Sequence, residues 1–264
     1  MKKTILAMGL VIACSLGAHA QFGKIKIDKA ASAVSKGVKS FTLTDAELKG
    51  YADECTKWED EHNHLCKTDD KYENTKAYAV RLEKIVTNVP ADLIKEYNLD
   101  IKAYHVTDVN AFARPNGSIR IFTPLMDLMS DDEVLAVIGH EIGHVVNKDS
   151  KDAFVTALRS SALKDAAGAV GGNTVSALTD SQLGDLAESL GNAQFSQKQE
   201  NQADAYGFEL LKKMGKDSSN MALSLGQLLK LQEEAGSPEN SKFNKLFSSH
   251  PDLKKRIETL NKKK

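Results

Sequence analysis

The chain has 264 residues, of which 41% are hydrophobic and 27% are charged, with 17 Gly and 5 Pro. This composition excludes collagen-like, low-complexity and wholly disordered proteins, and the length is enough for one domain with a sizeable core. The 35 Lys and Arg residues balance 36 Asp and Glu residues, so the sequence does not predict a basic surface that would bind nucleic acid.

The first twenty residues have the three parts of a secretory signal peptide. Two lysines precede an apolar stretch from Ile5 to Ala13, and Ala18-His19-Ala20 forms a small-x-small cleavage site. This stretch is too short to cross a bilayer, and no other segment of the sequence reads as a transmembrane span. We expect cleavage after Ala20 and a periplasmic or secreted protein. The alternative is a lipid anchor on Cys14, which ends a loose lipobox and would attach the protein to the envelope.

Signal cleavage leaves two cysteines, Cys55 and Cys66, in an oxidising compartment, and this setting favours a disulfide between them. One alternative is a free, buried Cys55, because this residue lies on the apolar face of a predicted helix. Another is a metal site formed by Cys55, His62, His64 and Cys66. The spacing speaks against it, since two histidines two positions apart on a helix do not face one ion.

Residues 21–43 are rich in Lys, Ala and Ser and are expected to be a leader or linker. A capping box at Thr44 and Glu47 then begins an amphipathic helix that extends to about Trp58. A second helical pattern ends before Pro90, which cannot continue a helix. The folded domain is therefore expected to begin at Thr44.

Two short strands are expected next, at Ile101–Val106 and Ile119–Phe122. The segment Asn110–Gly117 between them contains the Asn, Pro and Gly residues that favour turns. Such a turn could join the two strands as an antiparallel pair. The sequence therefore predicts a small antiparallel sheet.

The second half of the chain is mostly helical in its pattern. Ser130 and Glu133 form a capping box before an apolar, amphipathic helix. Residues 160–191 are rich in Gly, Ala, Ser and Thr and are expected to form a mobile loop or lid. Further helices are predicted from about Ala193 to Gly215, from about Asn220 to Gly236, and from Pro251 onward. The expected fold class is α+β, mostly α, in a single domain.

The sequence His-Glu-Ile-Gly-His at 140–144 is the strongest chemical signal. His140 and His144 lie one helical turn apart, so their imidazoles project from the same face and can bind one ion. Glu141 lies about 100° further round the helix, where a general base for a metal-bound water belongs. Two imidazoles and one carboxylate suit zinc and leave a position for water. We therefore expect one Zn2+ per chain.

The third ligand is expected on the helix that follows the Gly-rich segment. Glu200 and Asp204 are one turn apart, beside Ala203, Ala205 and Gly207, whose small side chains would let this helix approach the HEIGH helix. Glu200 could ligate the ion, while Asp204 could accept a hydrogen bond from a ligating histidine and fix its tautomer. The alternative is a solvated acidic face, but the upstream HEIGH sequence favours the ligand interpretation.

Four motifs occur in order along the chain. They are Asn110–Pro115 with the pattern Asn-Ala-x-Ala-x-Pro, His140–His144, Glu200–Asp204, and His250-Pro251 followed by Arg256-Ile257. Together they resemble the gluzincin metallopeptidases of the HtpX and CAAX prenyl endopeptidase family, in particular its small exported bacterial members. The resemblance covers residues 44–264 and implies a zincin-like, mostly helical fold around a small sheet.

The resemblance also implies an activity and a substrate. It implies a zinc endopeptidase acting on polypeptides, in particular unfolded or damaged cell-envelope proteins. By the same analogy, Ile119, Arg120, Ile121 and Phe122 form the edge strand against which an extended substrate pairs. The competing hypothesis is a zinc-containing periplasmic chaperone or assembly factor whose protease site is mostly latent. The presence of Glu141 and of every expected ligand favours the enzyme.

His250 has three interpretations. It could only flank a helix that begins at Pro251. It could donate a hydrogen bond to the oxyanion of the tetrahedral intermediate, the role that the resemblance suggests for the His-Pro motif. It could also occupy the fourth position on zinc, displace water and keep the enzyme latent.

Overall fold

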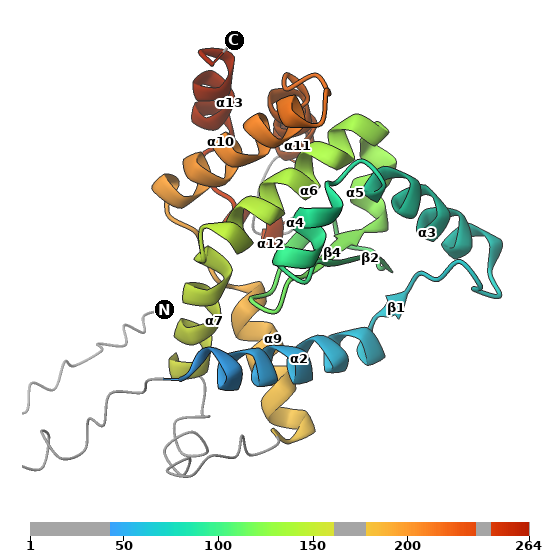
Figure 1. The fold of residues 1–264 in the computed structure, drawn as a ribbon, viewed down its shortest axis with the longest axis vertical. Helices are drawn as coiled ribbons and strands as arrows, with labels where there is room; N and C mark the ends of the chain where they lie inside the picture. Colours follow the sequence, from blue (N-terminus) through green and yellow to red (C-terminus); the bar gives the residue numbers. More distant parts are fainter. Residues whose placement is uncertain (1–42, 161–177, 236–243, 264) are drawn as a thin grey trace, which may run out of the picture. The chain divides into compact units, whose positions relative to one another are not determined.

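The computed structural model describes residues 43–160, 178–235 and 244–263 (Figure 1). The expected signal peptide, the expected linker as far as residue 42, and residues 161–177 of the expected loop lie outside these ranges. Within them the chain is mostly helical and has one small sheet, which confirms the predicted fold class. None of the helices in these ranges combines the length and the apolar character needed to cross a membrane.

The predicted capping boxes at Thr44 and Ser130 are both formed. In each, the hydroxyl accepts a hydrogen bond from the backbone N–H three residues on, and the glutamate there accepts one from the capping residue's own N–H. The described helices are α2 (Asp45–His62), α3 (Glu73–Val86), α4 (Ala91–Glu96), α5 (Thr123–Leu128), α6 (Asp131–Val146), α7 (Asp149–Ser160), α9 (Asp180–Gly191), α10 (Gln197–Lys213), α11 (Asn220–Ala235), α12 (Asn244–Ser249) and α13 (Leu253–Asn261).

The sheet has four strands in the order β1-β2-β4-β3 and is mixed. The strands are β1 (His64–Leu65), β2 (Asp100–His105), β3 (Ala111–Ala113) and β4 (Ser118–Phe122). β2 and β4 pair in parallel, so the predicted antiparallel pairing of these two segments is wrong. The chain between them forms β3, which pairs with β4 as an antiparallel hairpin. The chain therefore reverses direction once between β2 and β3 and again between β3 and β4, so that β2 and β4 run in the same direction.

The prediction that Ile119, Arg120, Ile121 and Phe122 form an edge strand is also wrong. These residues belong to β4, which lies inside the sheet between β2 and β3. The edge strand next to them is β3, which lies within the segment 110–117 that was expected to be a turn. The strand could not be recognised in the sequence, because it has only three residues, Ala111–Ala113, and turn-forming residues lie on both sides of it.

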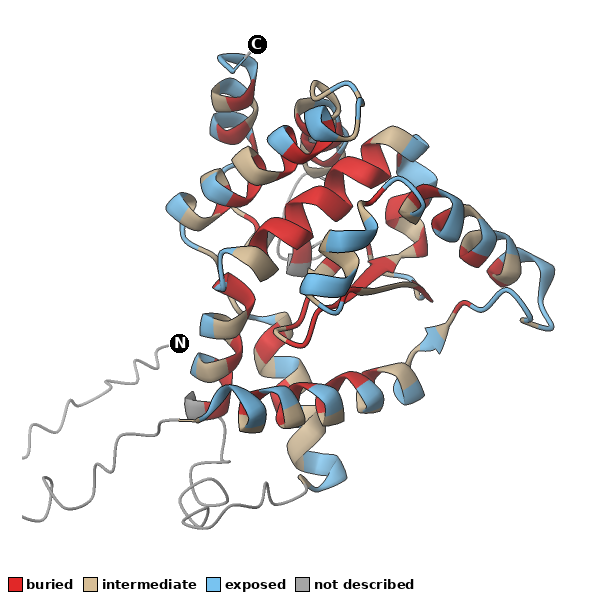
Figure 2. Cartoon of the chain, viewed as in Figure 1, coloured by how far each residue is buried: buried red, intermediate tan, exposed pale blue. Residues whose placement is uncertain are grey.

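α6 lies in the middle of the fold, and Figure 2 shows it buried along most of its length. α10 crosses it closely at two pairs of small residues. A methyl group built on Gly143 would lie 2.9 Å from the Cα of Ala203, and one built on Gly139 would lie 3.3 Å from the Cα of Gly207. Small residues at these points are therefore required for the two helices to approach, as the sequence suggested.

Two further boundaries differ from the sequence prediction. The last part of the expected Gly-rich loop is the helix α9, which begins at a capping box on Thr179. The last helix begins at Leu253 and not at Pro251, because Asp252 has a left-handed backbone with φ of 64°. His250 and Pro251 consequently lie in a short connection between α12 and α13.

The expected disulfide is not present: Cys55 and Cys66 are both free and buried. Cys55 lies on α2 near Glu59, whereas Cys66 is hydrogen-bonded through its N–H to Ala103 of β2 and packs in the main hydrophobic core. Burial raises the pKa of the Cys55 thiol to about 12 and that of Cys66 to about 11. The alternative of a free, buried Cys55 is therefore the one that the structure adopts.

The alternative metal site of Cys55, His62, His64 and Cys66 is also not formed. His64 Nε2 lies 2.7 Å from Asp70 Oδ2, and His62 Nδ1 lies 2.8 Å from the Trp58 carbonyl. Within the described ranges, the side chains that lie close enough together to share an ion are those of His140, His144, Glu200 and His250.

Both buried thiols should resist alkylation in the native protein at pH 8, because burial keeps them protonated and shielded. After unfolding in guanidinium without reductant, both should react with iodoacetamide, and peptide mass spectrometry would detect the adducts. A disulfide-linked peptide in place of the two adducts would contradict the free thiols.

Candidate metal centre

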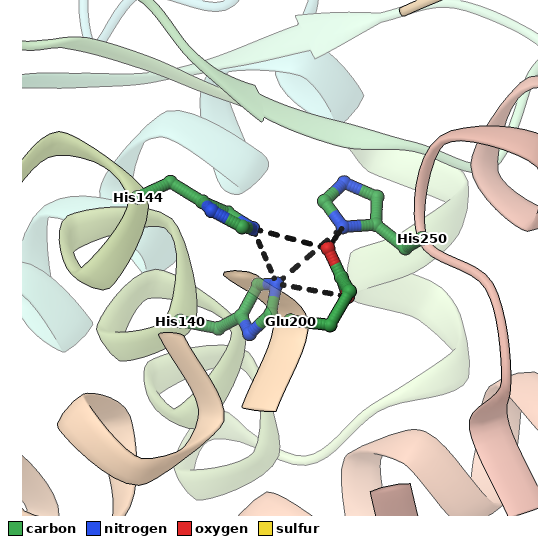
Figure 3. A group of neighbouring side chains, drawn as sticks. All are labelled: His140, His144, Glu200 and His250. Carbon is green, nitrogen blue, oxygen red and sulfur yellow. Dashed lines mark hydrogen bonds and ion pairs between the residues drawn. The ribbon is translucent and has the colours of Figure 1, made fainter. Parts of the chain in front are cut away.

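Four side chains from three parts of the chain converge in the middle of the fold (Figure 3). His140 and His144 come from α6, Glu200 comes from α10, and His250 comes from the connection after α12. All four are buried, and one possible ligand atom from each lies within 4.8 Å of the others. The structure thus brings together the three ligands expected from the sequence and adds His250 to them.

The distances between the donor atoms match those around one tetrahedral ion. Nε2 of His140 lies 3.1 Å from Nε2 of His144 and 3.4 Å from Nδ1 of His250. The Glu200 oxygens lie 3.3 Å from His144, 3.7 Å from His140 and 3.0 Å from His250. Tetrahedral bonds of 2.0–2.1 Å place ligand atoms about 3.3–3.4 Å apart. The donor set therefore has the size for one such ion.

The tautomers of the two α6 histidines also call for a cation. His140 Nδ1 lies 2.9 Å from Asp204 Oδ1, and His144 Nδ1 lies 3.0 Å from Asp149 Oδ2. A carboxylate only accepts hydrogen bonds, so each Nδ1 carries the hydrogen and each Nε2 points inward, where it can bind a metal ion or, on His144 without a metal, a second proton. Two lone pairs that face each other at 3.1 Å are stabilised when a cation lies between them.

Asp204 therefore accepts the hydrogen bond from His140 that the sequence predicted. Asp149 accepts the corresponding hydrogen bond from His144. Asp149 is the first residue of α7, five positions after His144. No ligand motif includes it, and its contact depends on the angle between α6 and α7, which the sequence does not reveal. Hydrogen bonds of this kind fix a ligand's ring orientation and raise its basicity.

Arg256 of α13 holds the two buried carboxylates of α10, Glu200 and Asp204. Its Nε lies 2.8 Å from Asp204 Oδ2, its Nη2 lies 2.7 Å from Asp204 Oδ1, and Nη1 forms an ion pair with Glu200 Oε2. This ion pair holds Oε2 on the Arg256 side, so Oε1, which lies 3.3 Å from His144 Nε2 and 3.0 Å from His250 Nδ1, is the oxygen that faces the other donor atoms. The sequence motif had included Arg256 without giving it a role.

Charge also favours a cation here. Burial would raise the pKa of Asp204, but Arg256 overcomes this and lowers it to about 2. Burial likewise opposes ionisation of Glu200, and the neighbouring His250 and Arg256 bring its pKa well below the usual value. Burial lowers the pKa of His140, whereas Asp149 and Glu200 raise that of His144 to about 9 despite its burial. The two buried carboxylates of α10 are therefore ionised, and a positive charge is stabilised between them and Asp149.

Glu141 lies beside the donor atoms and is not one of them. Its carboxylate is buried, and Oε1 lies 3.9 Å from His250 Nε2. Phe195 is stacked on His144, with ring centroids 4.0 Å apart, and lines the same cleft as Glu141. Phe195 could not be predicted from the sequence, because a lone aromatic residue before a helix carries no distinctive signal.

A narrow cleft leads to Glu141 and His250. β3 and its neighbours Asn110 and Arg114 form one wall, and the end of α9 with Phe195 forms the other. The cavity holds about 40 Å³, which is room for a few water molecules and too little for a peptide. The described structure is therefore a closed form of this cleft.

Comparison with known proteins identifies the family. A model of peptidase family M48 matches residues 79–264, which is well over half of the chain and includes the whole centre. The chain belongs to peptidase family M48. It is 37% identical over 220 residues to the metalloprotease LoiP of Escherichia coli strain K12, covering 83% of this chain and 81% of LoiP.

Two other M48 relatives agree. The chain is 32% identical over 260 residues to the metalloprotease YcaL of the same strain, covering 98% of this chain and 96% of YcaL. It is 33% identical over 190 residues to the protease HtpX of Glaesserella parasuis serovar 5 strain SH0165, covering 61% and 66%. This M48 chain is a metalloendopeptidase, and its His and Glu cluster is the candidate metal centre.

Replacing Asp149 should weaken metal binding without removing a ligand. Asp149→Asn can no longer hold the His144 ring through a charged acceptor, so we expect metal affinity to fall by about 10- to 100-fold. Competition with a chelating dye measures this. Asp152→Asn, an exposed carboxylate on the same helix, is the matched control and should leave the affinity unchanged. Equal affinities in the two variants would contradict the role of Asp149 in this M48 centre.

Proposed function

We propose that the metal is zinc and that the protein is a zinc endopeptidase of the cell envelope. The observation that carries the proposal is the buried donor set of two imidazoles and one carboxylate with tetrahedral spacing. That combination of ligand types and geometry is the one that zinc hydrolases use. His140, His144 and Glu200 would hold the ion.

In this proposal Glu141 handles the proton of the reaction. Bound zinc would supply Lewis acidity to the scissile carbonyl and to a water. Glu141 takes the proton from that water and delivers it to the leaving amine. Its position one residue after His140, buried at the end of the cleft, keeps the carboxylate close to the reacting atoms while leaving the ligand positions to other residues.

The edge strand β3 is our proposed substrate-binding strand, in place of the segment 119–122. In an antiparallel pair, every second residue forms backbone hydrogen bonds with the neighbouring strand. Asn110 and Arg114 form such bonds with residues 122 and 118. Ala111 and Ala113 therefore direct their carbonyl groups away from β4. An extended peptide can add to such an edge as a further strand. β3 lines the same cleft as Glu141, which would place the scissile bond beside the general base.

A second, apolar pocket suggests a cleavage preference. It adjoins the cleft, because Ala111, Glu141 and His250 line both. Its apolar lining residues are Leu125, Val137, Met221, Leu225, Leu228 and Leu246. Such a lining favours an apolar side chain next to the scissile bond, because burial of apolar surface is favourable.

His250 is proposed to be a latch. Its Nδ1 lies 3.0 Å from Glu200 and 3.4 Å from His140, at the corner that water or substrate would need on a catalytic zinc. α13 begins only at Leu253, so the interpretation as a helix start does not account for this position. The oxyanion role would require His250 to turn away from Glu200 first.

Export and quality control complete the proposal. The signal-like residues 1–20 support a periplasmic or secreted protein, with lipid anchoring through Cys14 as the alternative. A narrow cleft beside an edge strand, which would have to widen before an extended chain could enter, suits unfolded or damaged envelope proteins as substrates. The second candidate is a zinc-containing chaperone or assembly factor with a latent site. The observation that supports it is the same closed centre.

Glu141→Gln tests the enzyme against the chaperone. We expect casein hydrolysis to fall by at least about 100-fold while bound zinc is retained, because Glu141 acts on water and does not hold the ion. Glu200→Ala should instead lose most of the zinc. Glu209→Gln, an exposed glutamate on α10, is the control. Hydrolysis by Glu141→Gln at the wild-type rate would refute the general base, and a zinc-loaded wild type without hydrolysis would favour the chaperone.

His250→Ala tests the latch. We expect casein cleavage to rise several-fold with zinc retained, since the fourth corner becomes available to water. Cleavage and zinc content are measured on the same preparation, with His105→Ala as an exposed histidine control. A lower rate with full zinc content would support the oxyanion role and refute the latch.

A further inference from the structure

The edge strand β3 is short and has a strand partner on one side only. Three residues, Ala111–Ala113, pair with β4, and β3 ends the sheet. Backbone hydrogen bonds to a substrate are directional, so they require this strand to be held at a fixed angle. Its support must come in part from outside the sheet.

α2 supplies that support through a buried ion pair. Arg114, directly after β3, contacts Glu59 of α2 through two hydrogen bonds, Nε to Oε2 at 3.2 Å and Nη2 to Oε1 at 2.5 Å. Both side chains are only 7% exposed. The guanidinium also lies 4.0 Å from the ring centroid of Phe112, the middle residue of β3. A planar, two-pronged contact of this kind fixes orientation as well as distance.

The same helix also holds the opposite wall of the cleft. Trp58 Nε1 donates a hydrogen bond of 2.8 Å to Asp180, the first residue of α9, and the Trp58 ring lies beside Gly184. The far end of α9, at Leu190 and Gly191, lines the cleft across from β3. α2 is thus a common base for both walls, and it precedes residues 79–264, which the family model matches.

We propose that Glu59 and Arg114 are positioning residues that hold β3 at the angle needed to bind an extended polypeptide substrate. This inference rests on the proposed function, since it takes β3 to be the substrate-binding strand. Arg114 occupies the second variable position of the Asn-Ala-x-Ala-x-Pro pattern, and neither Glu59 nor Arg114 lies in the metal centre. The pair therefore acts on substrate binding and leaves metal binding and the proton transfer to other residues.

The test compares two quenched-fluorescence peptides of unstructured sequence, one extending past both ends of β3 and one covering little more than the scissile bond. For Glu59→Gln we expect KM for the long peptide to rise about five- to tenfold, the size of one lost backbone hydrogen bond. The kcat for both peptides and the zinc content should stay within twofold of wild type.

A double variant separates positioning from stability. Glu59→Gln leaves the Arg114 charge buried without its partner, which destabilises a fold, whereas Glu59→Leu combined with Arg114→Met removes both charges and keeps the volume. We expect this pair to restore the melting temperature while the raised KM for the long peptide remains, because apolar contacts do not fix the strand's angle. Recovery of KM together with the melting temperature would overturn the positioning role.

Arg81→Gln is the control, because Arg81 forms an ion pair with Asp131 away from the cleft. It should leave the KM for both peptides unchanged. A wild type that binds zinc and cleaves neither peptide would refute the proposed function itself. Cleavage of both peptides by Glu59→Gln with wild-type KM would instead overturn only the inference about Glu59 and Arg114.

Discussion

The close contact between α6 and α10 is the constraint on which the centre depends. The ligands lie on two helices, and Glu200 reaches the imidazoles of α6 only because Gly143 and Ala203 let the two backbones approach. A side chain as small as a methyl group at Gly143 would lie 2.9 Å from Ala203, closer than real Cβ atoms come. Substitution there would push Glu200 outward and enlarge the donor set beyond the size of one ion.

Electrostatics imposes the second constraint, because four carboxylates lie in a buried region around two imidazoles. They are Glu141, Asp149, Glu200 and Asp204, and Arg256 is the guanidinium that contacts the last two. Buried charges are costly unless they are paired, and the Arg256 guanidinium together with a protonated His144 does not balance four carboxylates. A divalent ion lowers that cost directly. Metal binding and fold stability should therefore be coupled in this protein.

Local patterns predicted the parts of the site that one helix determines. The HEIGH spacing and Glu200 could be found because ligands one turn apart, or beside small residues, follow from helical geometry alone. Asp149 and Arg256 could not, since their contacts depend on the angles between helices. The same reason explains the sheet: turn-forming residues at 110–117 gave no sign that three of them form β3 and that β2 and β4 become parallel.

The position of His250 also limits how the centre can open. His250 lies between α12 and Asp252, whose left-handed backbone separates this stretch from α13. Arg256, on the first turn of α13, remains tied to Asp204 by two hydrogen bonds. A displacement confined to the stretch before Asp252 would therefore break the contact between His250 and Glu200 and free the fourth corner. The carboxylates that orient and balance the centre would stay in place, so opening would break the contacts of His250 with Glu200 and His140 and leave the other three ligands where they are.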